Sequence, residues 1–413
     1  MTRADTLQST QIGKRFPNGG GNEGVRVSEI GIIMNGVSGR MGYRQHLVRS
    51  ILAIRDEGGV LLADGTRVQV VPLLVGRNEA KLAELAKRHN IADYTTDLDA
   101  ALSDDRWQIY SDFLVTKARS AALRKAIAAG KAIYTEKPTA ESYEEALDLA
   151  HLAAAAGIKN GVVHDKLYLP GLRTLKRVID SGFFGRILSV RGDFGYWVFE
   201  GDWQSAQRPS WNYRSEDGGG IVVDMFPHWS YLLENLFGAV ESVYAHATTE
   251  IPHRVDENGT TYRATADDAA YAIFQLAGGI TAQMNSSWTT RVDRGELVQF
   301  HVDGTRGSAV AGLFNCKLQP RTATPKPVWN PDIPDEHDYA ADWITAPANE
   351  PFENGFKIQW QEFLRYVLDD APHPYDLAAG ARGVRLAELA LESSRTGRRM
   401  TLADSKTHTT EGA

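Results

Sequence analysis

Two charged motifs in this 413-residue chain have the residue types of an acid–base site. Asp224 and His228 are four residues apart, so on a helix they would share one face. A carboxylate beside an imidazole raises the pKa of the imidazole and orients the ring, which suits a general base. Lys137, between Glu136 and Pro138, would place a cation beside a reacting hydroxyl group, to stabilise a developing alkoxide or relay its proton. We therefore predict that Lys137, Asp224 and His228 are catalytic; the alternative is a structural Asp–His pair and a solvated lysine.

A glycine-rich turn near the start of the chain has the pattern of a dinucleotide-binding site. The stretch Ile30–Gly42 reads IGIIMNGVSGRMG, a short apolar strand followed by glycines, and a helical pattern begins at Arg40. Such a turn lets the backbone approach a pyrophosphate, which the helix N-terminus favours. The spacing is GxxGxxG rather than GxGxxG, so the alternative is a tight turn without a ligand. The residues predicted to bind the cofactor here are Gly36, Ser38, Gly39, Arg40 and Met41.

The end of the next predicted strand, residues 68–75, bears on the choice between NAD and NADP. A carboxylate at this point would bind the ribose 2′-hydroxyl of NAD, whereas an arginine can accept the 2′-phosphate of NADP. Gly76 stands where the acid is expected, and Arg77 and Asn78 follow. Arg77 could bind the phosphate or stack on adenine, and Asn78 could bond a 2′-hydroxyl, so both cofactors stay open. The remaining residues predicted to bind the cofactor are Thr116, Glu136 and Lys137.

Two different patterns of elements must position these residues. From residue 27 to about 165, strand and helix patterns alternate, which predicts a parallel α/β sheet. In the second half, strands with one buried face predict a largely antiparallel sheet. These strands are expected at 188–199, 269–276, 280–288 and 297–302, and two helices near 355–369 and 377–396 end the pattern.

The stretch Tyr196–Arg214 is dense in aromatic and charged side chains. Aromatic faces stack on sugar rings and arginines bind anions in a bidentate way, so this stretch predicts a sugar site. The alternative is a packing loop or an oligomer contact. The predicted substrate-binding residues are Lys166, Tyr168, Trp197, Arg208, Trp211, Tyr213, Arg214, Asp224 and His228. The basic members of this set would favour an acidic sugar, such as a uronate, a sugar phosphate or a sulfonated sugar.

Composition excludes several classes of protein. A net charge of −7 gives no general attraction to nucleic acid or to an anionic membrane. No apolar stretch approaches the roughly 20 residues that span a bilayer. Cys316 is the single cysteine, which excludes internal disulfides and thiolate metal sites and fits a reducing cytoplasm. We expect a cytoplasmic protein without a metal site, a nucleic-acid partner or a membrane anchor.

Taken together, the motifs resemble the glucose–fructose oxidoreductase / inositol dehydrogenase / rhizopine-catabolism (Gfo/Idh/MocA) family. The glycine turn, residues 129–131 with 136–138, the stretch 218–228, residues 302–305 and residues 394–399 carry the resemblance, which runs from about residue 29 to 402. It implies a nucleotide domain, an open antiparallel sheet with the active site between the two, and dimers or tetramers packed through that sheet. Two stretches depart from the usual pattern: Thr116–Arg119 lacks the usual Thr-Pro, Asn and His, and His164–Lys166 replaces an Asn–Arg pair.

The predicted fold class is therefore α/β with two domains. We expect an N-terminal arm at 1–26, a Rossmann-type dinucleotide-binding domain at 27–165, an α+β substrate and oligomerisation domain with an open, mainly antiparallel sheet at 166–403, and a tail at 404–413. The predicted partners are a small carbohydrate and further copies of the chain, in a homodimer or homotetramer.

These residues leave three candidate functions. The first is an NAD(P)-dependent oxidoreductase that transfers hydride between a hydroxyl-bearing ring carbon of a sugar, sugar derivative or glycoside and C4 of nicotinamide. The second is an NAD-dependent glycoside hydrolase that oxidises its sugar transiently, eliminates the aglycone, adds water and returns the hydride, as the resemblance allows. The third is a cofactor-binding protein without activity, against which the intact Lys137 and the Asp224/His228 pair argue.

Overall fold

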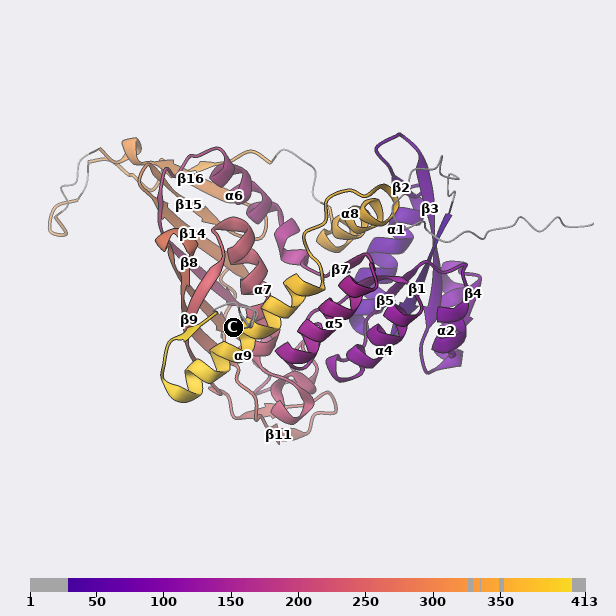
Figure 1. Cartoon of the computed structure of the whole chain (residues 1–413). Coiled ribbons are helices and arrows are strands. Elements are labelled where there is room, and N and C mark those ends of the chain that lie inside the picture. Colours follow the sequence, from indigo (N-terminus) through magenta and orange to yellow (C-terminus); the bar gives the residue numbers. More distant parts are fainter. Residues whose placement is uncertain (1–28, 326–329, 335, 349–352, 403–413) are drawn as a thin grey trace, which may run out of the picture. The chain divides into compact units, whose positions relative to one another are not determined.

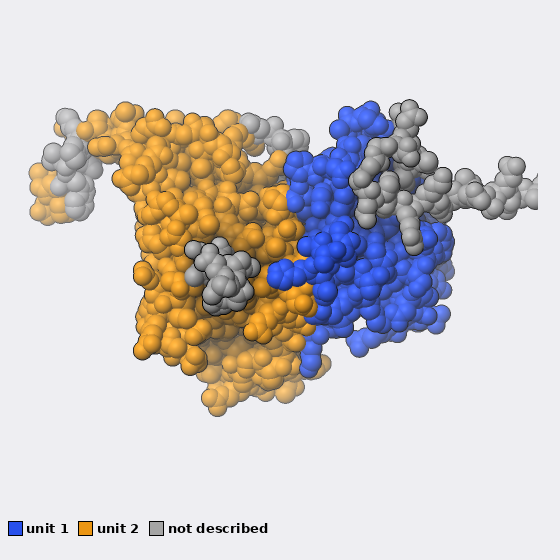
Figure 2. All heavy atoms as spheres, viewed as in Figure 1, with its two compact units in different colours: residues 1–136, 151–161, 360–373 blue, residues 137–150, 162–359, 374–413 orange. Residues whose placement is uncertain are grey.

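The computed structural model describes residues 29–325, 330–334, 336–348 and 353–402. They form two compact units, each assembled from separate stretches of sequence (Figures 1 and 2). Of the described residues, those at 29–136, 151–161 and 360–373 belong to unit 1, and those within 137–150, 162–359 and 374–402 belong to unit 2. The predicted arm at 1–26 and tail at 404–413 lie outside the described residues, and the predicted domain boundary at 165 stays a prediction.

A seven-stranded sheet organises unit 1, with the order β2-β3-β1-β5-β6-β7 and β4 paired to β3. Its strands are β1 (Glu29–Asn35), β2 (Val60–Leu61), β3 (Arg67–Val75), β4 (Asp93–Thr95), β5 (Ile109–Asp112), β6 (Ala132–Thr135) and β7 (Asn160–Val162). The ladders of β1 with β3 and β5 are parallel, whereas β2 pairs antiparallel with β3. Ile30, Ile32 and Ile33 have no exposed surface, as the apolar run of a parallel strand requires. The predicted parallel α/β sheet is confirmed.

The helices that connect these strands are α1 (Ala53–Asp56), α2 (Glu79–His89), α3 (Leu98–Ser103), α4 (Thr116–Ala128) and α5 (Tyr143–Ala155). Helix α8 (Gly355–Asp369) comes much later in the chain, and α5 and α8 each belong partly to both units. The helical pattern predicted from Arg40 onward contains η1 (Gly42–Leu52), a stretch with π-helical hydrogen bonding. Apolar spacing predicts a helix but does not distinguish its hydrogen-bond register, so this feature could not be foreseen.

A nine-stranded sheet organises unit 2, with the order β17-β16-β15-β14-β8-β13-β12-β9-β18. Its strands are β8 (Ile187–Gly195), β9 (Val240–Thr248), β12 (Ala269–Leu276), β13 (Thr281–Ser287), β14 (Val298–Gly304), β15 (Gly307–Ala311), β16 (Cys316–Pro320), β17 (Ile344–Thr345) and β18 (Met400–Thr401). Only β8 and β13 pair in parallel in this sheet, so the predicted mainly antiparallel sheet is confirmed. Two short strands, β10 (His253–Val255) and β11 (Thr261–Arg263), pair separately.

Helices α6 (Pro170–Asp180), α7 (Ile221–Leu236) and α9 (Leu377–Thr396) pack on this sheet (Figure 1). Helix α7 is the central one: Trp229 is fully buried, and its indole Nε1 donates to Ser286 Oγ on β13 at 2.9 Å. The start of α7 is fixed by Asp267, whose Oδ2 accepts the Val222 N–H at 2.8 Å. Gly220 precedes it with φ +132°, and a Cβ there would lie 2.7 Å from Asp267 Oδ1. The glycine is therefore needed where the helix begins, and it places Asp224 in the first turn.

Candidate functional site

Lys137 and Asp224 meet in unit 2, although they are 87 positions apart. Lys137 Nζ donates to Asp224 Oδ1 at 2.7 Å and to the Asp224 backbone carbonyl at 3.0 Å. Arg208 Nη2 lies 2.9 Å from Asp224 Oδ2, an ion pair whose N–H is not aligned as a hydrogen bond. Burial alone would raise the pKa of Asp224, but the charges of Arg208 and Lys137 outweigh it and hold that pKa well below its usual range. Asp224 is therefore an ionised counterion to two cations.

The partners of His228 are not Asp224, as predicted, but two other side chains. Its Nε2 lies 3.1 Å from Lys166 Nζ, and its Nδ1 lies 2.6 Å from the Tyr231 hydroxyl. No hydrogen bond or ion pair among the described residues joins it to Asp224. Burial, followed by the charge of Lys166, lowers the pKa of His228 well below its usual value. The prediction that Asp224 raises the pKa of His228 is wrong, because the carboxylate is turned to Lys137 and Arg208 and a lysine contacts the imidazole instead.

Lys166 enters this cluster from η2 (Asp165–Tyr168), the 3-10 turn that follows β7. Burial lowers the pKa of its ammonium group, and the charge of Asp165, whose carboxylate lies 3.7 Å away, partly opposes that shift. The Lys166 side chain is 16% exposed, and those of Lys137, Arg208 and Asp224 are 15%, 17% and 22% exposed. Four charged groups of the cluster thus keep access to solvent, and His228, 4% exposed, lies beneath them.

Aromatic rings hold Arg208 in place. Its guanidinium lies 4.9 Å from the centre of the Phe199 ring and 4.8 Å from that of Trp288, which is fully buried. Such contacts fix the orientation of the cation toward Asp224. Sequence reasoning identified Arg208 but missed Phe199, Trp288 and Tyr231, because an aromatic residue inside a strand or helix pattern looks the same whether it packs in the core or supports a site.

The other predicted substrate-binding residues differ in how far they are buried. Tyr213 and Tyr168 are buried. The Tyr213 hydroxyl donates to the Phe199 carbonyl at 2.7 Å, and burial raises the pKa of Tyr213 to about 12. By contrast, Trp211 is 43% exposed. No hydrogen bond, ion pair or ring contact in the described part of the chain joins Trp197, Trp211 or Arg214 to Asp224, so their place in a substrate site stays a prediction.

The glycine turn of unit 1 has the form that a dinucleotide requires. Gly36 has φ +77°, and its carbonyl accepts the Gly39 N–H at 3.0 Å. A Cβ on Gly42 would come within 3.0 Å of that carbonyl and of Phe113. The turn residues Gly39 and Arg40 are exposed after the buried strand β1. These residues fit a bound pyrophosphate, because the backbone is bare where the phosphates would approach.

Asn78 has a structural role that its predicted cofactor contact did not include. Its Oδ1 accepts the Lys81 N–H at 3.0 Å and so caps the N-terminus of α2. Lys81 in turn donates to the Ser38 carbonyl at 3.1 Å and ties α2 to the glycine turn. Arg77 is exposed and Thr116 opens α4. Their contacts with a cofactor remain predictions.

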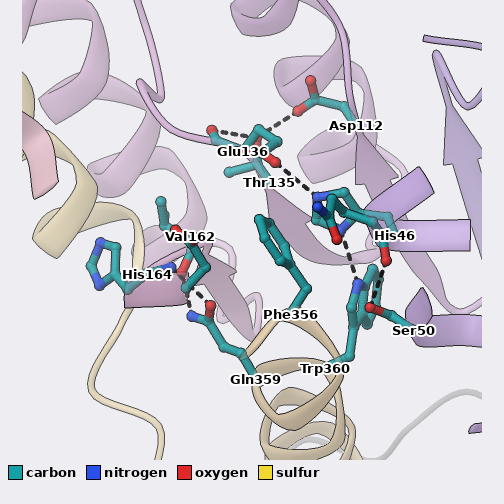
Figure 3. A network of polar contacts seen from close by, with 12 residues as sticks. His46, Ser50, Asp112, Thr135, Glu136, Val162, His164, Phe356, Gln359 and Trp360 are labelled. Carbon is teal, nitrogen blue, oxygen red and sulfur yellow. Dashed lines mark hydrogen bonds and ion pairs between the residues drawn. The ribbon is translucent and has the colours of Figure 1, made fainter. Parts of the chain in front are cut away.

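Glu136 is held by a buried histidine that the sequence did not reveal (Figure 3). His46 Nε2 lies 2.8 Å from Glu136 Oε1, and Trp360 Nε1 donates to His46 Nδ1 at 3.0 Å. Since Nδ1 accepts from the indole, the ring proton sits on Nε2 and is donated to the carboxylate. Figure 3 also shows Gln359, whose Oε1 accepts the His164 N–H at 2.8 Å. Glu136 therefore has a fixed carboxylate directly before Lys137.

Among the residues that the structure describes, no group of three or more His, Cys, Asp or Glu side chains could hold a metal ion. Within the same residues, no helix is both long and apolar enough to cross a membrane.

Two family models match the chain. Residues 30–164 match the model described as "Oxidoreductase family, NAD-binding Rossmann fold", and residues 172–310 match the "GFO/IDH/MocA C-terminal domain". Among characterised relatives, a D-xylose dehydrogenase of Paenarthrobacter nicotinovorans is 59% identical over 369 residues, which cover 88% of this chain and 95% of the relative. A levoglucosan dehydrogenase of Pseudarthrobacter phenanthrenivorans is 25% identical over 56% of this chain and 62% of its own length.

Solved structures with the same fold include a levoglucosan dehydrogenase in complex with NADH and L-sorbose. Its TM-score is 0.73 at 20% identity, with 90% of this chain and 98% of that chain covered. An oxidoreductase domain protein from Kribbella flavida gives a TM-score of 0.74 at 18% identity, with 91% and 99% covered. The likeness confirms the predicted architecture of a Rossmann domain with a second, mainly antiparallel sheet.

Proposed function

Because the chain belongs to the GFO/IDH/MocA family of NAD(P)-dependent oxidoreductases, we propose that it is a sugar dehydrogenase whose substrate is a neutral aldose such as D-xylose. Residues 30–164 form the NAD-binding Rossmann fold. The relative that is 59% identical over nearly its whole length supports a free sugar as the substrate. The bound nicotinamide cofactor supplies the hydride acceptor, and the residues of this chain must bind the sugar and manage its hydroxyl proton.

The observation that carries this proposal is the charged cluster of unit 2. Lys137 and Arg208 flank Asp224, and Lys166 contacts His228 beside them. Loss of hydride from a carbon requires loss of the proton from its hydroxyl group, and nearby cations stabilise the alkoxide that develops. In this proposal Lys137 holds the reacting oxygen, and Asp224 orients Lys137. Gly36, Ser38, Gly39, Arg40 and Met41 would hold the cofactor.

The same cluster favours a neutral sugar over an acidic one. Two of its cations, Lys137 and Arg208, are already paired with Asp224, so their charge is partly neutralised before a substrate arrives. A free carboxylate or phosphate would have to compete with Asp224 for them. The acidic sugars considered from the sequence are therefore the weaker proposal.

The test follows reduced cofactor at 340 nm with NAD or NADP and a panel of aldopentoses, aldohexoses and uronates. Aryl glycosides are included, and release of their aglycone is measured in the same samples. Stoichiometric reduction of cofactor with a neutral aldose and no aglycone release is the expected result. Catalytic aglycone release without net reduction would instead establish the hydrolase alternative, for which the relatives give no support.

We also propose a cytoplasmic homodimer or homotetramer assembled through the open face of the nine-stranded sheet. Tyr244 on β9 and Ile273 on β12 are cross-strand neighbours on that face, with exposed fractions of 44% and 51%, and Tyr271 is 46% exposed. Exposed apolar patches of this kind mark interaction surfaces. Light scattering of Tyr271→Lys/Ile273→Lys should show a smaller species than the unchanged protein; equal masses would contradict this assembly.

A further inference from the structure

A hydrogen-bond relay in unit 1 joins Trp360, His46 and Glu136 (Figure 3). Trp360 Nε1 donates to His46 Nδ1 at 3.0 Å, and His46 Nε2 lies 2.8 Å from Glu136 Oε1, to which it donates its proton. Trp360 and His46 have no exposed surface, whereas the Glu136 side chain is 10% exposed. The relay therefore runs from the core of unit 1 to a carboxylate that a ligand can reach.

The backbone that carries Glu136 is fixed as well. Thr135, the last residue of β6, donates from Oγ1 to Asp112 Oδ2 at 2.5 Å. Asp112 is the last residue of β5 and is fully buried, and its Oδ1 accepts from Arg119 Nε at 3.0 Å. These bonds join the carboxyl ends of β5 and β6. Glu136 is thus held both through the main chain beside it and through its own carboxylate.

His46 reaches this place from η1, the stretch with π-helical hydrogen bonding. Such stretches are rare and occur mostly at functional sites. The His46 ring stacks on Phe113, with 4.2 Å between the ring centroids. A Cβ on Gly42, the last glycine of the turn, would come within 3.0 Å of the same phenylalanine. His46 therefore connects the glycine turn with the carboxyl ends of β5 and β6.

The order of the strands indicates which half of the cofactor would meet Glu136. In the sheet of unit 1, β3, β1, β5 and β6 are successive neighbours. In a dinucleotide-binding fold the adenosine ribose lies at the end of the strand that corresponds to β3, and the pyrophosphate lies at the turn after β1. The ends of β5 and β6, on the other side of β1, would therefore face the nicotinamide half. A carboxylate repels phosphate but accepts from hydroxyl groups, which the ribose of that half supplies.

We propose that His46 and Trp360 are positioning residues for the cofactor, which hold the Glu136 carboxylate where it accepts from the hydroxyl groups of the nicotinamide-bearing ribose. This inference rests on the nicotinamide cofactor of the proposed function and not on its sugar. An ionised carboxylate can accept several hydrogen bonds, so the one from His46 leaves acceptor capacity for the ribose. Because the carboxylate is fixed before the cofactor arrives, less side-chain entropy is lost on binding.

The Trp360 N–H has a separate part in this arrangement, because it determines which nitrogen of His46 carries the proton. Without that N–H the ring proton could move to Nδ1, and Nε2 would then present a lone pair to the Glu136 carboxylate. Two acceptors repel each other, so the carboxylate would turn away. Trp360→Phe should therefore release Glu136 although it keeps an aromatic ring in the core.

The test measures binding by calorimetry and needs no turnover. The ligands are NADH, ADP-ribose, which keeps the second ribose but lacks nicotinamide, and ADP, which keeps only the pyrophosphate and the adenosine. In His46→Met and in Trp360→Phe we expect NADH and ADP-ribose to bind roughly 10-fold more weakly, and ADP to bind as before. His46→Gln should restore part of the affinity, because its amide offers both a donor and an acceptor.

Phe363→Leu is the matched control, since Phe363 is fully buried on the same helix as Trp360 and packs on Tyr134. It should lower the melting temperature, as the relay variants do, but leave all three affinities unchanged. Glu136→Gln supplies the second control. If His46 acts through the carboxylate, His46→Met added to Glu136→Gln should weaken NADH binding by less than about 2-fold more.

Several results would overturn the inference while NADH binding by the unchanged protein remains intact. They are unchanged NADH affinity in both relay variants, an equal loss for ADP, and full additivity of His46→Met with Glu136→Gln. A loss confined to NADH, with ADP-ribose unaffected, would also overturn it, because the contact would then be to the nicotinamide ring and not to the ribose. If the unchanged protein binds no NADH, the proposed function fails as well.

Discussion

Replacing Asp224 by Asn should destabilise unit 2 by about 3 kcal/mol at pH 7. The carboxylate lies 2.7 Å from Lys137 Nζ and 2.9 Å from Arg208 Nη2. At an effective dielectric constant of about 20, each contact represents about 6 kcal/mol of gross attraction, most of which is offset by desolvation of the charges. Removing one partner of a buried pair costs about 3–5 kcal/mol, and the residual exposure of 15–22% places this site at the lower end.

The assay is chemical or thermal unfolding followed by tryptophan fluorescence, from pH 7 to pH 3. At ~2 °C per kcal/mol for a domain of ~250 residues, the melting temperature should fall by about 6 °C. Because the pKa of Asp224 is lower in the folded than in the unfolded chain, its contribution is fully present above about pH 4 and is lost as the pH falls further. The difference between the two proteins should therefore shrink below pH 4.

Asp217→Asn is the matched control, because the Asp217 carboxylate is 46% exposed and lies as far as 4.0 Å from its ion-pair partner Arg214. A surface pair of this kind contributes about 0–1 kcal/mol, so its loss should hardly be detected. If Asp224→Asn were as stable as the unchanged protein at pH 7, or if its deficit were the same at pH 7 and pH 3, the electrostatic account of the cluster would be wrong.

Three further outcomes follow from other parts of unit 2. Burial raises the pKa of Cys316 to about 11, so a thiol reagent at pH 8 should label the native protein at least ~100-fold more slowly than the unfolded protein; similar rates would contradict it. In Gly219→Ala the new Cβ would lie 2.4 Å from the Asn212 carbonyl, so we expect a loss of ~1–3 kcal/mol in urea unfolding, with reduced activity. Arg254→Met leaves the fully buried Asp268 without its ion-pair partner and should cost ~3–5 kcal/mol; an unchanged urea midpoint would refute that.

Much of the fold follows from local pattern. Helix α9 was predicted at its observed bounds, because the apolar spacing ends at clear signals: Asp376 Oδ1 accepts the Ala379 N–H, and Gly397 closes the helix at φ +65°. The strands β8, β12, β13 and β14 were found for the same reason, since alternation depends on burial of one face. Other strands of the same sheet were not foreseen: β9, β15, β16, β17 and β18. The last two contain two residues each, which carry no periodicity.

The charged side chains of the candidate site and His228 were predictable from the sequence, but their pairings were not. The spacing of Asp224 and His228 places both on one side of α7, yet it does not say which way each side chain turns. Lys137, from a distant part of the sequence, forms an ion pair with Asp224, and Lys166 contacts His228. A single sequence does not reveal which distant side chain will contact a given group. The local spacing therefore favoured an Asp–His pair, and the predicted rise in the pKa of His228 is wrong.

Because stretches of the two units alternate along the sequence, the chain cannot be divided into its units by one cut. The chain passes from one unit to the other after residues 136, 150, 161, 359 and 373. A fragment that stopped at the end of β7 would lack Trp360 and Phe363, which are fully buried in unit 1 against Tyr134. Such a fragment would expose an aromatic core and aggregate. A transplantable cofactor-binding module therefore needs residues 360–373 joined back by a linker, and a single proteolytic cut cannot release either unit.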